Sequence, residues 1–257
     1  MAKTPEELYQ ERAKRVDDAI HLRVPDRVPI VPFPEFFPLK YTGITMEEAM
    51  YDYDKTYAAW KRTITDFEWD EYVVPDLYSG KVYEHLDYKQ LRWPGHGVKP
   101  THPYQFIEPG QVLDGQEVYA PMSAEDYDWF LDDPSDYMIR AYFPKIFGTL
   151  SPLAKLPPIH SIICWYQGMF DALPVIGDPE VRGALRSLIK AGTEALKWLD
   201  SFIMFVDEMK DMGFPTFTLS LSQAPYDFIA NFLRGTRGAM IDMYRNPDKL
   251  RQSCEKV

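Results

Sequence analysis

The sequence predicts an α/β fold, in which short buried strands alternate with amphipathic helices and polar loops follow the strands. Its clearest unit is the stretch 216–235, where an apolar, β-branched run leads through a polar loop to Pro225, a residue suited to the first position of a helix. Two further strand candidates, 26–32 and 71–78, flank a long helical stripe. Because two strands joined by one helix are typical of a parallel βαβ unit, we expect a barrel-like α/β enzyme with its chemistry in the loops after the strands.

Composition excludes several classes of protein. The formal charge of −11 argues against a nucleic-acid surface or an anionic membrane, since both bind basic patches. No apolar run is long enough to span a bilayer, and the N-terminus does not resemble a signal peptide. Cys164 and Cys254 are the only cysteines, so a reduced, cytoplasmic setting is the simplest interpretation.

Helix start signals organise the N-terminal third. Capping boxes of the form Thr-x-x-Glu begin at Thr4 and Thr45 and predict a helix behind each. The first helix should end near residue 21, and the second carries an aromatic and methionine stripe as far as Phe67. We interpret this stripe as core packing rather than a cofactor site. Each helix is followed by one of the first two strand candidates.

Residues 80–122 are rich in glycine and proline and alternate without a helical period. We expect them to form a β-hairpin excursion that covers one end of the main sheet. The other elements that the sequence predicts are a helical region at 123–156, a strand at 158–165, helices at 178–212, 225–235 and 237–244, and a last helix still running at Val257.

Polar side chains in the loops after the strands are the candidate site residues. Asp76 and Glu35 follow two strands, where a carboxylate can act as an acid, a base or a hydrogen-bond acceptor; a helix cap or a solvated loop residue is the alternative. Gln223 and Tyr226 suit the orientation of a polar ligand, or hydrogen bonds to the loop backbone. The histidines lack zinc-site spacing, so no metal site is predicted.

Several separated segments resemble the uroporphyrinogen decarboxylase superfamily. In that family a barrel strand ends in Gly-Ala-Pro and an aromatic residue, a helix runs on to Glu-Gly, and a Tyr-x-x-Pro-Glu-x-Leu helix start follows. This chain has Ser-Gln-Ala-Pro-Tyr at 222–226, Phe-Leu-Arg-Gly at 232–235 and Tyr-Arg-Asn-Pro-Asp-Lys-Leu at 244–250. The stretch from Glu11 to Pro29 is similar to the family's entry into its first barrel strand.

The resemblance implies a (β/α)8 TIM barrel of the uroporphyrinogen decarboxylase type. Residues 1–257 would be an incomplete, N-terminal portion of that single domain, with 80–122 as an excursion within it. Asp76 falls where the decarboxylases have the aspartate that hydrogen-bonds the pyrrole nitrogens of the tetrapyrrole, so it is the expected catalytic residue. The expected substrate-binding residues are Glu35, Gln223, Tyr226 and Asn231.

The chain departs from the decarboxylases at two places. They bind the substrate's carboxylates with an Arg-x-x-x-Arg loop after the first strand, whereas residues 33–40 contain Glu35 and Lys40 and no arginine. Asn231 replaces the tyrosine of the helix that follows Ala-Pro. A loop with Glu35 in place of two arginines would repel an acetate-bearing porphyrinogen, which argues against decarboxylation.

The superfamily's other branch, the cobalamin-dependent methyltransferases, is therefore the leading interpretation. These enzymes move methyl groups between small donors, corrinoid proteins and thiol or folate acceptors. We expect a corrinoid-linked methyltransferase acting on a methoxylated aromatic, a methylamine, a methylthiol or a similar small substrate, with the corrinoid carried by a partner protein. Zinc is left open, because the family's His-x-Cys…Cys ligands are not in this sequence.

Two alternatives stay open. One is uroporphyrinogen decarboxylase, a lyase of porphyrin and heme biosynthesis, using other cations such as Lys40 or Arg92 for the substrate's carboxylates. The other is a non-catalytic subunit that binds a corrinoid protein. A homodimer is compatible with each of these functions.

Overall fold

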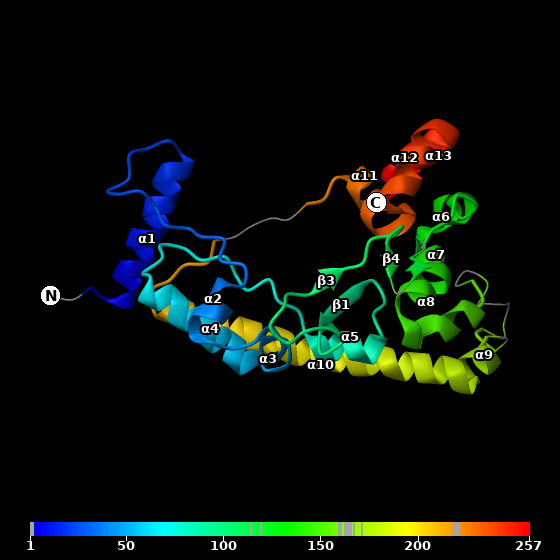
Figure 1. Cartoon of the computed structure of the whole chain (residues 1–257), viewed down its shortest axis with the longest axis horizontal. Coiled ribbons are helices and arrows are strands. Elements are labelled where there is room, and N and C mark those ends of the chain that lie inside the picture. The colour runs from blue at the N-terminus through cyan, green and yellow to red at the C-terminus, as the bar shows by residue number, and fades with distance from the viewer. Residues whose placement is uncertain are drawn as a thin grey trace. The chain divides into compact units, whose positions relative to one another are not determined.

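The structure of the chain is a computed structural model, in which helices predominate (Figure 1). It describes residues 3–113, 115–118, 120–158, 161, 166, 168–170, 172–217 and 222–257. Helix makes up 61% of the structure, and the largest sheet has three short strands. The chain is therefore α-rich, and the barrel predicted from the sequence is not shown.

The chain divides into two compact units. Unit 1 consists of Met1–Lys81, Trp93–Tyr104 and Thr193–Leu221, and unit 2 consists of Val82–Arg92, Gln105–Gly192 and Ser222–Val257. The helix α10 (Pro179–Asp211) contributes residues to both units. This is the long helix predicted at 178–212, and its bounds are confirmed to within one residue.

Unit 1 begins with four helices: α1 (Pro5–Ile20), α2 (Phe37–Thr42), α3 (Met46–Tyr51) and α4 (Tyr53–Asp66). Both predicted capping boxes are confirmed, because the hydroxyls of Thr4 and Thr45 each accept a hydrogen bond from the N–H three residues later. The helix expected from Thr45 to Phe67 is broken at Asp52, whose carboxylate accepts from the Lys55 N–H and caps α4.

The aromatic stripe of α4 packs into the core of unit 1, as predicted. Trp60 and Ile64 are almost fully buried, and the Tyr57 ring stacks on Phe205 of α10 at a centroid distance of 5.0 Å. Tyr72 meets Phe205 edge-on at 5.6 Å. Apolar burial of these rings is the main term that holds α4 against α10.

Among the described residues, the strand candidates 26–32 and 71–78 form no β-ladder. Instead, the Asp70 N–H donates to the Ile30 carbonyl (2.9 Å), and Tyr72 makes a parallel bridge with Thr216. The prolines in these segments supply no N–H donor, which opposes a continuous ladder. In the described part of unit 1, these extended segments are thus linked at isolated points.

A buried ion network joins α1 to the two extended segments that follow it. Asp70 has no solvent exposure, and its carboxylate accepts from Arg27 through two hydrogen bonds of 2.7 Å, from the Ile30 N–H at 2.8 Å, and from Arg15. Arg15 also donates two hydrogen bonds of 2.6 Å to Asp26, which holds the pKa of that carboxyl at about 2. The network fixes the chain that leads into the next loop.

Unit 2 is built from short helical pieces: α6 (Tyr127–Asp132), α7 (Pro134–Tyr137), η1 (Met138–Tyr142), α8 (Phe143–Ile146), η2 (Gly148–Lys155), α9 (Leu173–Gly177), α11 (Pro225–Phe228), η5 (Ile229–Arg234), α12 (Gly235–Arg245) and α13 (Pro247–Cys254). The helical region predicted at 123–156 is confirmed in these pieces. The last helix ends at Cys254 rather than running on at Val257. The core gathers Tyr127, Phe130, Tyr137, Ile229 and Leu233, all almost fully buried.

The expected excursion at 80–122 is confirmed in part. It begins with a helix, α5 (Gly80–Leu86), where no helix was predicted. Then come β1 (Leu91–Pro94), β2 (Gly97–Val98) and β3 (Gln105–Phe106), in the sheet order β2-β1-β3. The hairpin itself is formed by β4 (Val112–Leu113) and β5 (Gln116–Glu117), which pair in antiparallel register.

The helix predicted at 225–235 is present as α11 and the π-helix η5. It ends at Gly235, where φ is +72° and an added Cβ would lie 2.8 Å from the Cβ of Pro109, so only glycine fits. Of the strand expected before it, Thr216 makes the bridge to Tyr72, and residues 218–221 lie outside the described residues. Most of the strand expected at 158–165 also lies outside them.

Candidate functional site

The loop after the first extended segment encloses a pocket in unit 1. Glu35 lies in the left-handed region (φ +45°), a strained conformation for a residue other than glycine, and α2 follows at once. Gly43 (φ +80°) ends α2 and donates its N–H to the Leu39 carbonyl (2.9 Å), which turns the chain back towards Thr45. The pocket has a volume of about 590 Å³. We call it the loop pocket; it is lined by Pro34, Glu35, Phe36, Phe37, Leu39, Lys40, Gly43, Ile44, Thr45, Met46, Thr101 and Pro103.

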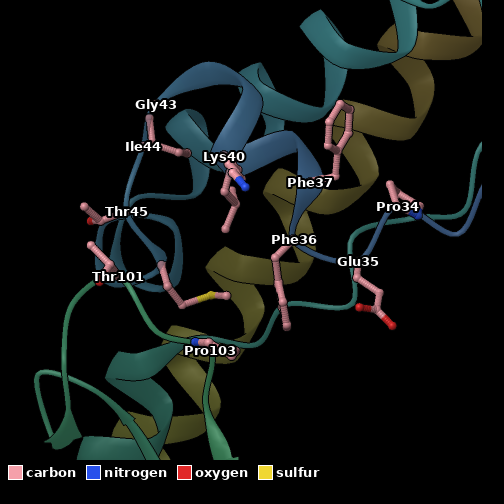
Figure 2. A pocket seen from close by; sticks show the side chains of 12 residues that line it. Pro34, Glu35, Phe36, Phe37, Lys40, Gly43, Ile44, Thr45, Thr101 and Pro103 are labelled. Carbon is pink, nitrogen blue, oxygen red and sulfur yellow. The ribbon is translucent and has the colours of Figure 1, made fainter.

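Two charged side chains line the loop pocket, Glu35 and Lys40 (Figure 2). Figure 2 shows the carboxylate of Glu35 pointing away from Lys40, with Phe36 between them in that view. Within the part of the chain that the structure describes, neither side chain makes an ion pair or a side-chain hydrogen bond. Both charges are therefore available to a ligand.

A half-buried tyrosine, Tyr104, joins this loop to Asp76. Its ring meets Phe36 edge-on, with 5.8 Å between centroids. Burial raises the pKa of Tyr104, and the negative charges of Asp76 and Glu35 raise it further. Asp76 is exposed, and its negative charge also raises the pKa of Tyr78. Glu35 and Asp76 thus act on the same phenol in unit 1.

The other predicted site residues lie in unit 2. Gln223 is exposed, and Tyr226 is half-buried against the core of that unit. Asn231 lies on η5 and lines a smaller pocket of about 250 Å³ with Phe106, Glu108, Pro109, Ala230, Phe232 and Thr236. The role of these three residues in binding a ligand stays a prediction.

The sequence patterns did not identify Tyr78 and Tyr104 as neighbours of the candidate site. Tyr78 follows Asp76 by two residues in an extended segment, so the alternation of side chains was a usable signal that both point to one side. Tyr104 carried no such signal, because it follows a glycine- and proline-rich stretch whose course depends on tertiary contacts. The hydroxyls of Thr45 and Thr101, which also line the loop pocket, had no pattern to mark them.

A half-buried carboxyl, Glu71, adds a pH-dependent term to the stability of unit 1. Burial, with the negative charge of the neighbouring Asp70, raises its pKa to about 7. Because the carboxyl of the unfolded chain has its ordinary pKa of 4.5, the native state holds more protons than the unfolded state between pH 4.5 and about 7. The contribution of Glu71 to the free energy of unfolding is therefore largest below pH 4.5 and falls as the pH rises from 4.5 to about 7.

Replacing Glu71 with glutamine is expected to remove the decrease in stability that its ionisation causes above pH 7. At pH 8 the variant should be more stable than the unchanged protein by about 1–2 kcal/mol, allowing for solvent screening, and by clearly less at pH 5. Urea denaturation at both pH values measures the difference. Glu68→Gln, an exposed neighbour, is the control and should show no such pH dependence; an equal response of both variants would contradict the assignment to Glu71.

The described residues contain no group of three or more histidine, cysteine, aspartate or glutamate side chains that could hold a metal ion. In the same residues, no helix has the length and apolar character required to cross a membrane. No family model, no curated protein and no solved structure matches this chain. The family resemblance of the sequence motifs thus stays a prediction.

Proposed function

We propose that this chain is a methyltransferase-like member of the uroporphyrinogen decarboxylase superfamily, which binds a small methylated substrate in the loop pocket. The observation that carries the proposal is the loop pocket itself. Its walls are mainly apolar, it has one negative and one positive side chain, and it occupies the loop where the decarboxylases have their arginine pair. A barrel of the uroporphyrinogen decarboxylase type is proposed with it, supported by the parallel bridge between Tyr72 and Thr216.

The charges of the loop pocket favour a small donor over a porphyrinogen. A porphyrinogen has several carboxylates, which require several cations in fixed positions. Among the described residues that line the loop pocket, Lys40 is the only cation, and the carboxylate of Glu35 would repel a second carboxylate of the substrate. A volume of about 590 Å³ and apolar walls are typical of sites for a single small organic molecule.

In the proposed reaction, this chain's residues bind and orient the methyl donor. The corrinoid, carried by a partner protein, supplies the methyl acceptor. Phe36, Leu39 and Met46 would exclude water from the apolar part of the donor, while Glu35 and Lys40 would fix its polar groups. Asp76, whose negative charge acts on Tyr104 as that of Glu35 does, is the proposed hydrogen-bond acceptor beside the donor.

The proposal is tested by mixing the chain with its corrinoid protein or with free cob(I)alamin and following the corrinoid spectrum as methyl donors are added. Methylation of the corrinoid is the expected result. The variants Lys40→Ala and Asp76→Asn should each lower kcat/KM by about tenfold, as expected for the loss of one hydrogen bond to a charged group. Glu6→Ala, an exposed change on α1, is the control and should leave it unchanged.

Two outcomes would contradict the proposal. Decarboxylation of uroporphyrinogen without any methyl transfer would identify a decarboxylase. Tight binding of a corrinoid protein with no turnover by the complex would identify a non-catalytic binding subunit.

A further inference from the structure

The loop pocket can bind two opposite charges at once, because its own charges do not neutralise each other. Glu35 and Lys40 both line it, and within the described residues neither forms an ion pair. Most other charged groups in unit 1 are paired, as Lys55 is with Glu48 and Lys61 with Glu208. An apolar pocket that holds separate positive and negative groups is complementary to a molecule with one charge of each sign.

The negative side of the loop pocket is also its aromatic side. Phe36 lines the pocket, and its ring packs nearly perpendicular to that of Tyr104, with 5.8 Å between the centroids. The negative charges of Glu35 and Asp76 both act on the phenol of Tyr104. Aromatic rings beside carboxylates are the arrangement that binds quaternary ammonium groups, which have no N–H to donate.

The positive side offers hydrogen-bond donors. Lys40 lies in the last turn of α2 and lines the pocket. The hydroxyl of Thr45 is used in its capping box, where it donates to the Glu48 carboxylate, and the hydroxyl of Thr101 is within hydrogen-bond distance of His102. The ammonium of Lys40 is therefore the group that can bind a carboxylate.

We propose that the loop pocket selects a betaine-type zwitterion, with a methylated ammonium against Phe36, Tyr104 and Glu35 and a carboxylate against Lys40. The inference rests on the proposed function and names the substrate class of the same pocket.

A quaternary ammonium is also a chemically sufficient methyl donor. The bond from nitrogen to the methyl carbon breaks with its electron pair going to nitrogen, and the electron pair of the reduced corrinoid forms the new bond to that carbon. The leaving molecule keeps its carboxylate and has an uncharged amine nitrogen, so the step needs no proton.

Binding to the full chain tests this directly, without any methyl transfer. The probes are glycine betaine, its longer relative γ-butyrobetaine, and 3,3-dimethylbutanoate, in which a carbon replaces the charged nitrogen of glycine betaine. We expect at least one betaine to bind at least about tenfold more tightly than 3,3-dimethylbutanoate, since both have the carboxylate but only the betaine has the positive charge that gains the cation–π contact and the attraction to Glu35. Tetramethylammonium, which lacks the carboxylate, should also bind more weakly. Isothermal titration measures all four affinities.

Matched variants show which pocket residue binds each end of the betaine. Phe36→Leu should weaken betaine binding about fivefold and leave the binding of 3,3-dimethylbutanoate almost unchanged. Lys40→Gln should weaken the binding of all three probes that have a carboxylate and leave the binding of tetramethylammonium unchanged. Circular dichroism of each variant shows whether the fold is retained. Phe33→Leu is the control, because Phe33 is exposed and does not line the loop pocket.

The outcomes separate this inference from the proposed function. Equal affinity for glycine betaine, γ-butyrobetaine and 3,3-dimethylbutanoate, or no binding of any probe, would overturn the inference, whereas methyl transfer from another donor would still support the proposed function. Selective betaine binding with no methyl transfer to cob(I)alamin would support the binding site and contradict the proposed function.

Discussion

Replacing Asp70 with alanine is expected to destabilise unit 1 by about 3–5 kcal/mol. The change removes the shared partner of Arg15 and Arg27 and leaves the Ile30 N–H without its acceptor. Most of the lost stability comes from Arg15, because its side chain is 4% exposed and water cannot fully solvate its positive charge once Asp70 is removed. Asp26 and Glu11 still contact Arg15, so the loss falls short of a fully isolated buried charge.

Hydrogen exchange followed by mass spectrometry measures this effect where it should arise. Peptides from α1 and from the extended segment around Ile30 should exchange much faster in Asp70→Ala, while those from α12 in unit 2 should change little. Asp54→Ala, an exposed change in the first turn of α4, is the control and should cost less than about 1 kcal/mol. Equal losses from the two variants would show that the network around Asp70 does not hold unit 1 together.

Replacing Asp242 with alanine is the corresponding change in unit 2, and we again expect a loss of about 3–5 kcal/mol. Asp242 is 1% exposed and accepts from Arg234 (2.6 Å), Tyr127 (2.9 Å) and Asn246 (3.0 Å). Burial alone would raise its pKa, but these hydrogen bonds outweigh burial and lower it. Without Asp242, the half-buried guanidinium of Arg234 and the buried phenol of Tyr127 lose their charged partner.

A double-mutant cycle checks that the effect comes from the ion pair. Arg234→Met combined with Asp242→Ala should be less destabilised than the sum of the single changes, since the double variant has no unpaired charge. Asp248→Ala, exposed in the first turn of α13, is the control. Simple additivity of Arg234→Met and Asp242→Ala in urea denaturation would contradict the account of this network.

Local signals predicted the helices well, because the information for a helix lies in neighbouring residues. The capping boxes at Thr4 and Thr45 and the long stripe of α10 are examples. Strands were predicted less well, since a strand needs partners that are distant in the sequence. The segment that contains Ile30 has strand-like composition but makes hydrogen bonds with Asp70 at one point instead of a ladder. The break at Asp52 was missed because the apolar stripe continues through it.

The candidate site was predicted in part for a similar reason. Glu35 and Asp76 could be chosen because each follows a strand candidate and has a charge, and both charges raise the pKa of Tyr104 in unit 1. Tyr104 and Thr101 belong to a stretch without helical or strand period, so only tertiary structure shows that they lie beside residues 34–46. Gln223 and Tyr226 were chosen as polar side chains in the loop after a strand candidate, and Asn231 by family resemblance; all three stay predictions of a ligand contact.

Binding of the methyl donor in the loop pocket can be observed by NMR of the full chain, labelled so that only phenylalanine and tyrosine rings are protonated, in the presence of glycine betaine or γ-butyrobetaine. We expect nuclear Overhauser effects from the trimethylammonium protons to the rings of Phe36 and Tyr104. The effect to the Phe36 ring should disappear in Phe36→Leu. Contacts to Phe106 and Phe232 beside Asn231 instead, or no contact to any ring, would contradict binding of the methyl donor in the loop pocket.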